Sequence, residues 1–254
     1  MIEKTNKETG HLYGLIGFPL THSFSKKYFE KKFEKENLDA CRFENFPLAD
    51  ITEFPKLISQ NKNSLKGLAV TIPYKKQVIP FLDNTANIPA GLNACNCIKI
   101  ENEKLTGYNT DWMGFDKSFT TLLQPHHTKV LVLGSGGAAA AVCYALQKNK
   151  MDYQLVSRQK ASENVLTYKE LTPALMREYN VIVNTTPLGS HSFINEFPLI
   201  PYECITAQHY CFDLNYNPAE TVFLQKAKQT GATIKNGMDM LTLQAEINWQ
   251  IWNR

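Results

Sequence analysis

The chain has 254 residues, of which 43% are hydrophobic and 20% charged, and this composition is typical of a globular protein of one or two domains. Its formal net charge of +3 comes from 27 basic and 24 acidic residues spread along the chain. The sequence therefore has no continuous basic stripe of the kind that binds nucleic acid, and we expect no nucleic-acid partner. The polar residues 1–10 lack the apolar segment of a signal sequence, and no apolar stretch approaches the roughly 20 residues of a membrane span. We therefore expect a cytoplasmic protein without a membrane partner.

The cysteines and histidines do not have the spacing of metal ligands. The six cysteines include no CxxC pair and the six histidines no HxxxH pair. Cys95 and Cys97 are the closest pair, but alternate residues of a strand point to opposite faces. We expect reduced thiols and no metal.

The first half of the chain predicts strands that alternate with helices. An apolar strand over residues 12–17 ends at Gly-Phe-Pro, and aromatic residues at helical spacing follow from Phe24 to Phe33. Residues 68–72 form a second apolar strand, stopped by Pro73, and residues 94–100 a third. This order is typical of a parallel or mixed α/β sheet.

The second half predicts a more regular α/β arrangement. A helix begins at Thr110-Asp111, and residues 129–133, a glycine-rich turn, an alanine-rich helix through Leu146 and residues 153–156 then form a βαβ unit. Further strands are expected at residues 181–184, 210–213 and 232–234, with a helix at 221–229. A last helix carries Leu241, Ala245, Trp249 and Trp252 on one face, and we expect it to return to the first domain.

A glycine-rich turn joins the strand at residues 129–133 to the following helix. Its sequence is Gly134-Ser135-Gly136-Gly137-Ala138-Ala139, and a strand followed by GxGGxA and a helix is the setting of a dinucleotide-binding loop. Glycine lets the backbone approach a pyrophosphate, which the free N–H groups and the helix dipole stabilise. The alternative is a glycine-rich turn without a ligand.

The end of the next strand predicts which dinucleotide binds. An NAD site usually has Asp or Glu there to hold the ribose 2′-hydroxyl, whereas this chain has Ser157-Arg158-Gln159-Lys160. A guanidinium binds a 2′-phosphate that a carboxylate would repel. We predict NADP(H), with Arg158 on the phosphate; otherwise Arg158 and Lys160 are solvated surface charges.

Polar clusters in the first half lie where strands end or helices begin. Ser23 and Ser25 could bind an anion such as a carboxylate, or either could be a helix N-cap. Lys75 follows the second strand, and Asp111 is either an N-cap or a functional acid. A Lys and an Asp that converge on a carbonyl would suit its reduction, because the oxygen that gains charge needs a donor and then a proton.

Seven segments together resemble the shikimate dehydrogenase family, in the order in which that family has them. In the first half, residues 17–25 (GFPLTHSFS) resemble the motif GxPxxHSxS, residues 67–75 (GLAVTIPYK) resemble GxNVTxPxK, residues 94–96 (ACN) resemble the AVN of GAVNT, and residues 107–111 (GYNTD) resemble GxNTD. In the second half, residues 183–189 (VNTTPLG) resemble VNxTPxG, residues 213–218 (DLNYNP) resemble DxxYxP, and residues 236–244 (NGMDMLTLQ) resemble NGxxMLxxQ. The chain departs from these motifs at Ala69, Asn93 and Cys97, and at Gln159 from the NRT that commonly ends the second nucleotide strand.

The resemblance implies reversible NADPH-dependent reduction of 3-dehydroshikimate to shikimate, in the chorismate pathway to aromatic amino acids. It implies two domains with the active site in a cleft between them: a mixed-sheet substrate domain (residues 1–110 plus 238–254) and a Rossmann-type NADP domain (residues 111–237). The protein would be a monomer or a homodimer.

The resemblance also assigns roles to individual residues. Lys75 would be the acid/base at the reacting oxygen, with Asp111 as its partner. The substrate carboxylate would bind Ser23 and Ser25, and its ring hydroxyls Thr71, Asn96, Asp111 and Gln244. Tyr216 and Gly237 would line the cleft, and Asn184 and Thr185 would border the central part of the cofactor. Two alternatives are a quinate or quinate/shikimate dehydrogenase and a non-catalytic dinucleotide sensor on the same fold.

Overall fold

The computed structural model describes residues 10–20, 23–160 and 162–254. The chain divides into two compact units, of which the first comprises residues up to Thr110 together with Ala245–Arg254, and the second comprises Asp111–Gln244.

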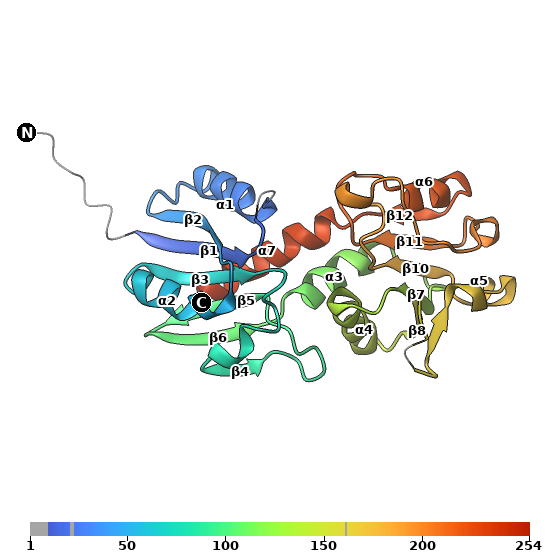
Figure 1. Ribbon diagram of the computed structural model, residues 1–254. Helices are drawn as coiled ribbons and strands as arrows, with labels where there is room; N and C mark the ends of the chain where they lie inside the picture. Colours follow the sequence, from blue (N-terminus) through green and yellow to red (C-terminus); the bar gives the residue numbers. More distant parts are fainter. Residues whose placement is uncertain (1–9, 21–22, 161) are drawn as a thin grey trace, which may run out of the picture. The chain divides into compact units, whose positions relative to one another are not determined.

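A mixed six-stranded sheet forms the centre of the first unit (Figure 1). Its strands are β1 (His11–Gly17), β2 (Cys41–Pro47), β3 (Leu65–Val70), β4 (Asn84–Asn87), β5 (Cys97–Glu101) and β6 (Lys104–Tyr108), in the order β2-β1-β3-β5-β6-β4. The β1/β2, β1/β3 and β4/β6 pairs are parallel, whereas β5 is antiparallel to both β3 and β6. The helices α1 (Phe24–Lys35) and α2 (Phe54–Asn61) complete this α/β fold.

The end of the chain packs into the first unit through aromatic side chains. Trp252 is near the end of α7 (Met238–Trp252), and its ring stacks on Tyr13 of β1 at a centroid distance of 5.2 Å. Its ring also lies 5.4 Å from that of Phe29 of α1. A Cβ on Gly67 would come within 2.3 Å of the Trp252 ring, so only glycine lets β3 pass beneath the indole.

The second unit contains a parallel six-stranded sheet with the order β12-β11-β10-β7-β8-β9. The strands are β7 (Lys129–Leu133), β8 (Asp152–Ser157), β9 (Val165–Thr167), β10 (Val181–Asn184), β11 (Tyr210–Asp213) and β12 (Thr233–Lys235), and the helices α3 (Asp111–Phe119), α4 (Gly137–Lys148), α5 (Pro173–Glu178) and α6 (Val222–Gln229) belong to the same unit. The chain starts at the central strand β7, runs outward to β9 and returns to β10 on the other side of β7. This is the strand order of a Rossmann fold, in which ligands bind where the order reverses.

The sequence placed the second domain boundary at 238, whereas the contacts place it at Ala245, inside α7. The first half of α7 packs against α3 of the second unit. A Cβ on Gly114 of α3 would lie 2.7 Å from the Met240 carbonyl oxygen and 2.9 Å from Gln244 Cβ. One continuous helix therefore serves both units, and composition marks no break within it.

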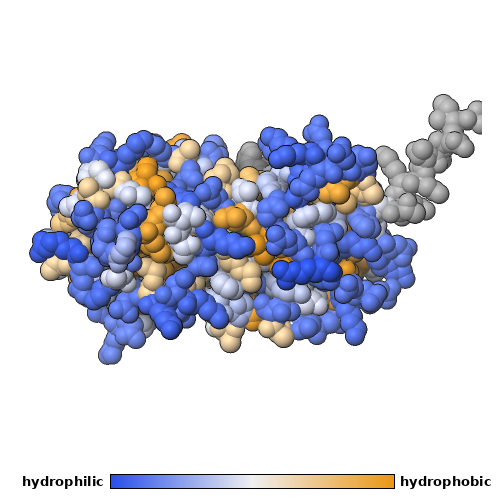
Figure 2. Space-filling model, turned by 180° about the vertical axis from the view of Figure 1, so that it is seen from behind, coloured by the Kyte–Doolittle hydropathy of each residue, from blue (hydrophilic) through white to orange (hydrophobic). Residues whose placement is uncertain are grey.

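The surface shown in Figure 2 is mixed in hydropathy, with separate apolar patches between hydrophilic side chains. Within the described part of the chain, no helix combines the length and the apolar character needed to cross a membrane.

Candidate active site

The turn after β7 depends on glycine at its first position. Gly134 has φ +115°, in the region that favours glycine, and a Cβ there would lie 2.5 Å from Thr185 Oγ1. Thr185 follows β10, and its hydroxyl donates to the Leu133 carbonyl at 2.7 Å. The two central strands are therefore joined at their carboxyl ends.

The start of α4 is open, as an anion site requires. Gly136 precedes the helix with an extended backbone and provides no side-chain cap, and the first turn contains no acidic residue. A Cβ built on Gly136 or Gly137 would meet no atom within 4 Å. Ser135 and Ala138 are exposed beside them. The N–H groups of a first helical turn have no partner within the helix, so they are available to a phosphate.

A pocket of about 1160 Å³ lies over the carboxyl ends of β7, β8 and β10. Its polar edge contains Gly134, Ser135, Gly136, Ser157, Arg158, Gln159, Thr185 and Thr186, and its other lining residues include Tyr168, Pro187, Leu188, Phe193, Glu196, Phe197 and Leu199. Because the strand order reverses between β7 and β10, the pocket has the position and residue types of a dinucleotide site.

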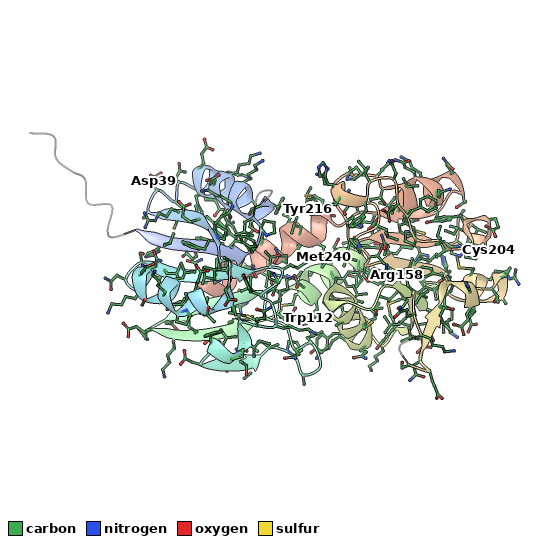
Figure 3. The ribbon with its side chains drawn as sticks, viewed as in Figure 1. Asp39, Trp112, Arg158, Cys204, Tyr216 and Met240 are labelled. Carbon is green, nitrogen blue, oxygen red and sulfur yellow. The ribbon has the colours of Figure 1, made fainter. Side chains whose placement is uncertain are left out.

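The two basic residues after β8 differ in their partners. Lys160 Nζ forms an ion pair with Glu170 Oε1 at 3.0 Å. Hydrogen bonds from Thr167, together with Lys160, lower the pKa of Glu170 to about 2. Arg158, labelled in Figure 3, is exposed, lines the pocket and has no carboxylate partner among the described residues. Arg158 is therefore available to an anionic ligand, and Lys160 is occupied.

The side chains of Ser157 and Asn184 shape the pocket from within the protein. The Ser157 hydroxyl donates to the Gln159 carbonyl at 2.9 Å and accepts from the Gln159 N–H at 3.3 Å. Asn184 is fully buried, and its Nδ2 donates to Asp213 Oδ1 at 3.1 Å. The Asn184 amide thus lies beneath the lining residues Thr185 and Thr186, where it bonds to protein groups.

Asp213, the last residue of β11, is a buried carboxyl that the sequence analysis did not single out. Burial raises its pKa to about 6, although hydrogen bonds from Thr221, Asn215 and Asn184 oppose that shift. Within the DLNYNP segment, the family resemblance assigns a role only to Tyr216. The pattern of apolar and polar residues along a strand does not show whether a carboxyl at its last position is buried.

In the first unit, hydrogen bonds gather the segments that carry Lys75, Asn96 and Thr110. The Lys75 carbonyl accepts from the Cys95 N–H at 2.7 Å. Asn96 is buried, its Nδ2 donates to Thr110 Oγ1 at 2.9 Å, and its Oδ1 accepts from the Thr110 N–H at 2.6 Å. The Thr110 hydroxyl lies 2.6 Å from Asn248 Oδ1 of α7. Thr71 follows β3 and donates its N–H to the Ile16 carbonyl at 2.9 Å.

Ser23 is the N-cap of α1, and its hydroxyl accepts from the Lys26 N–H at 3.4 Å. Ser25 is buried in the first turn of that helix. The adjoining Thr21 and His22 of the polar cluster lie outside the described residues. The N-cap interpretation of Ser23 is therefore correct, and the long cap bond leaves its hydroxyl able to accept or donate further.

The other predicted residues belong to the second unit. Asp111 is the first residue of α3, so it lies one position inside the helix instead of capping it. Gln244 lies on α7 beside Gly114. Gly237 donates its N–H to the Asn215 carbonyl at 3.0 Å, and a Cβ there would lie 2.0 Å from the Leu214 carbonyl oxygen. Tyr216, labelled in Figure 3, is half-buried, and burial raises the pKa of its phenol. The pairing of Lys75 with Asp111 stays a prediction.

Two comparisons place this chain among known proteins. A family model described as the shikimate dehydrogenase substrate binding domain matches residues 15–98. The shikimate dehydrogenase (NADP(+)) of Carboxydothermus hydrogenoformans is 36% identical over 265 residues, which cover 98% of this chain and 93% of that protein. The chain belongs to the shikimate dehydrogenase family.

Solved structures of this fold include the shikimate dehydrogenase of Aquifex aeolicus, which is 33% identical, with coverage of 100% of this chain and 94% of that one and a TM-score of 0.82. The 5-ketofructose reductase of a Gluconobacter species is 25% identical, with coverage of 96% and 94% and a TM-score of 0.83. The fold of the shikimate dehydrogenases therefore also occurs in a protein named for another carbonyl substrate, and fold alone does not decide the substrate.

The structure shows the surroundings of each departure from the shikimate dehydrogenase motifs. Ala69 of β3 and Cys97 of β5 are direct partners in the antiparallel ladder, and both are buried, so two neighbouring motif positions change together. Asn93 replaces the motif glycine at φ +43°, a left-handed conformation that asparagine tolerates better than most residues. Gln159 contacts Ser157 through its backbone, so its side-chain identity does not affect that turn.

Proposed function

We propose that the protein catalyses the reversible, NADPH-dependent reduction of 3-dehydroshikimate to shikimate, a step of the chorismate pathway to aromatic amino acids. The observation that carries this proposal is the pocket at the reversal point of the second sheet, where an open glycine loop lies near a guanidinium that has no carboxylate partner in residues 10–20, 23–160 and 162–254. Membership of the shikimate dehydrogenase family supplies the substrate class.

The residues of the second unit fit NADP(H). The backbone of residues 134–138 would bind the pyrophosphate, and Arg158 would bind the 2′-phosphate. Ser157 would hold the turn after β8, Asn184 would hold the turn after β10, and Thr185 would border the central part of the dinucleotide. The nicotinamide, which supplies the hydride when bound, would lie toward Gly237. No acidic residue occupies the first turn of α4 to repel the phosphates.

Residues of the first unit, together with Asp111 of α3, Gln244 of α7 and Tyr216, would hold the substrate. Ser23 and Ser25 would bind its carboxylate, and its ring hydroxyls would bind Thr71, Asn96, Asp111 and Gln244, with Tyr216 beside them. Lys75 would donate a hydrogen bond to the carbonyl oxygen, stabilise the negative charge that develops there and transfer the proton. Asp111 would orient the ammonium group and accept a hydroxyl hydrogen bond.

A spectrophotometric assay tests the function directly. Oxidation of NADPH is followed at 340 nm, near the absorbance maximum of the reduced nicotinamide, with 3-dehydroshikimate, with 3-dehydroquinate and with 5-ketofructose in separate reactions, and each is repeated with NADH. We expect kcat/KM to be highest for 3-dehydroshikimate with NADPH. A preference for dehydroquinate would favour the quinate dehydrogenase alternative, and binding of NADP(H) without turnover of any substrate would favour a dinucleotide sensor.

We further propose a cytoplasmic protein that acts as a monomer or a homodimer on a small-molecule substrate. All six cysteines are unbridged, including Cys41 and Cys204, which are partly exposed, and free thiols persist in a reducing compartment. Light scattering coupled to gel filtration gives the oligomeric state.

A further inference from the structure

Asp213 is a fully buried carboxylate whose hydrogen-bond donors are all neutral. Its Oδ1 accepts from Asn184 Nδ2 at 3.1 Å, from the Asn215 N–H at 3.0 Å and from Asn215 Nδ2 at 2.9 Å. Its Oδ2 accepts from Thr221 Oγ1 at 2.6 Å. These four bonds tie the end of β11 to the end of β10 and to the N-cap of α6.

The same two asparagines hold the turn that lines the pocket. Asn215 Nδ2 also donates to the carbonyl oxygens of Thr186 and Leu188, at 3.1 and 3.0 Å. Asn184 Oδ1 accepts from the N–H of Thr186 at 3.0 Å and from its hydroxyl at 2.7 Å. Residues 186–188 are lining residues of the pocket, so the carboxylate lies one hydrogen-bonded side chain away from its wall.

Packing on the far side of this turn leaves it little freedom. Gly189 has φ +94°, and a Cβ there would come within 2.9 Å of Thr221 Cβ, so the turn closes directly onto the residue that donates to Asp213 Oδ2. The turn is thus fixed from beneath by Asn184 and Asn215 and from its end by Thr221.

A buried carboxylate without a cationic partner is unfavourable for stability. Burial raises the pKa of Asp213 to about 6, and an apolar residue of similar size would avoid that desolvation. Its presence is explained if several donors must converge on one acceptor to fix the turn.

We infer that Asp213 is a positioning residue for the dinucleotide: its carboxylate, through Asn184 and Asn215, holds residues 186–188 where they form the wall of the cofactor pocket. This inference rests on the proposed function, since it assigns NADP(H) to that pocket. Asp213 acts through its acceptor geometry and does not touch the ligand.

Calorimetric titration of NADP⁺ at pH 8 into cofactor-free protein tests the inference. Asp213→Leu removes the acceptor while keeping the branched outline of the side chain, with methyl groups in place of the two oxygens, and we expect the Kd to rise at least about tenfold, the effect of about 1.4 kcal/mol of lost preorganisation. Asp213→Asn keeps an oxygen for the three donors at Oδ1, and the Thr221 hydroxyl can turn to accept from the new amide, so we expect a Kd within about threefold of wild type.

Two further variants complete the design. Asn215→Ala removes the hydrogen bonds to the Thr186 and Leu188 carbonyls. Because Asn215 is partly exposed, this variant keeps the test valid if Asp213→Leu does not fold. We expect its Kd for NADP⁺ to rise about tenfold as well. His209→Asn is the matched control, because His209 is buried and hydrogen-bonded at the opposite end of the same strand, and it should leave the Kd unchanged.

Steady-state kinetics separate positioning from general destabilisation. In Asn215→Ala the KM for NADPH should rise, while the KM for 3-dehydroshikimate and kcat at saturating NADPH stay near wild type. The inference is overturned if the folded Leu and Ala variants bind NADP⁺ as wild type does, or if Asp213→Asn is as damaging as Asp213→Leu. Failure of the wild-type protein to bind NADP⁺ would instead refute the proposed function.

Discussion

At the scale of single residues, the structure separates groups with different tasks in the same small region. Arg158 and Lys160 are two positions apart, but only Lys160 has a carboxylate partner in the described part of the chain. A charge that is already paired contributes less to a new ligand than an unpaired one, because the existing ion pair must be broken or shared. The two residues therefore form a matched pair for mutagenesis.

Replacement of Arg158 by Ala should raise the KM for NADPH about 10- to 100-fold, since hydrogen bonds to a charged group contribute roughly 1.5–3 kcal/mol. The KM for NADH should stay nearly unchanged, because NADH has no 2′-phosphate. Lys160→Ala is the control and should alter neither constant by more than about twofold. Equal effects of Arg158→Ala on both cofactors would contradict the assignment.

Lys75→Ala should lower kcat by about 10²- to 10⁴-fold with a modest change in the KM for 3-dehydroshikimate, because a general acid acts mainly in the transition state. The neighbouring exposed Lys76 provides the control, and Lys76→Ala should retain wild-type turnover. Near-normal turnover of Lys75→Ala would refute its role.

The buried carboxyl of Asp213 should make stability depend on pH. Its pKa is about 6 in the folded protein against an ordinary value of 3.8, so the folded state binds the proton more tightly and the gain from protonation is lost as pH rises through 6. In cofactor-free protein, this group should add about 1 kcal/mol to the unfolding free energy at pH 5 relative to pH 8.

Urea unfolding of wild type and Asp213→Asn at both pH values measures this difference. The asparagine variant lacks the titration, so its unfolding free energy should change less in favour of pH 5 than that of wild type. Parallel pH dependence in the two proteins would show that Asp213 does not titrate in this range.

At the scale of elements, the junction of β7 and α4 combines a strained turn with an open helix start. Gly134 is required by the fold, since its φ is +115° and its missing Cβ makes room for Thr185. Gly136 has an ordinary φ of −85° and open space around its Cα, so the protein alone does not require glycine there. Close approach of a ligand to the backbone explains the second glycine.

The two glycines therefore predict different outcomes. Gly134→Ala should destabilise the cofactor-free protein by about 1–3 kcal/mol through backbone strain and contact with Thr185. Gly136→Ala should leave its melting temperature unchanged and weaken NADP⁺ binding. Thermal unfolding without ligand, followed by NADP⁺ titration, distinguishes them, and an unchanged NADP⁺ affinity in Gly136→Ala would place the pyrophosphate elsewhere.

At the scale of the whole molecule, one helix connects the two units. α7 begins in the second unit beside α3 and ends in the first, where Trp252 stacks on Tyr13 and covers Gly67. The last turn of the chain thus completes the core of the unit in which the chain began. The polar residue Asn248 of the same helix meets Thr110, the residue immediately before Asp111.

Trp252→Ala should destabilise the first unit by about 3–5 kcal/mol, the usual cost when a buried indole is truncated. Chemical unfolding monitored by circular dichroism provides the measurement. Gln250→Ala, at an exposed position on the same helix, is the control and should change the unfolding free energy by less than about 0.5 kcal/mol. A loss of similar size in both variants would show that the indole contributes no special packing.

The sequence predicted the central strands β7, β10 and β11 with their observed bounds, because each has a short run of buried apolar residues next to one polar residue: Lys129 at the start of β7, Asn184 at the end of β10 and Asp213 at the end of β11. The strands β2, β4, β6 and β9 were not predicted. β4 is entirely exposed, and β9 has only three residues, so neither has an apolar pattern to detect. The strand expected at residues 94–100 begins at Cys97, although the Asn96 N–H still donates to the Tyr108 carbonyl and the Asn96 carbonyl still accepts from the Val70 N–H.

The sequence by itself determined the alternation of strands and helices, the glycine loop, the basic residue after β8 and the family, because these depend on local pattern and on motifs in order. Only the tertiary structure decided that Lys160 is paired and Arg158 is not, that Ala69 and Cys97 are cross-strand partners, and that Asp213 supports the pocket wall through Asn184 and Asn215. These properties depend on contacts between residues distant in sequence, and burial, which sets the pKa of Asp213, exists only once those contacts form.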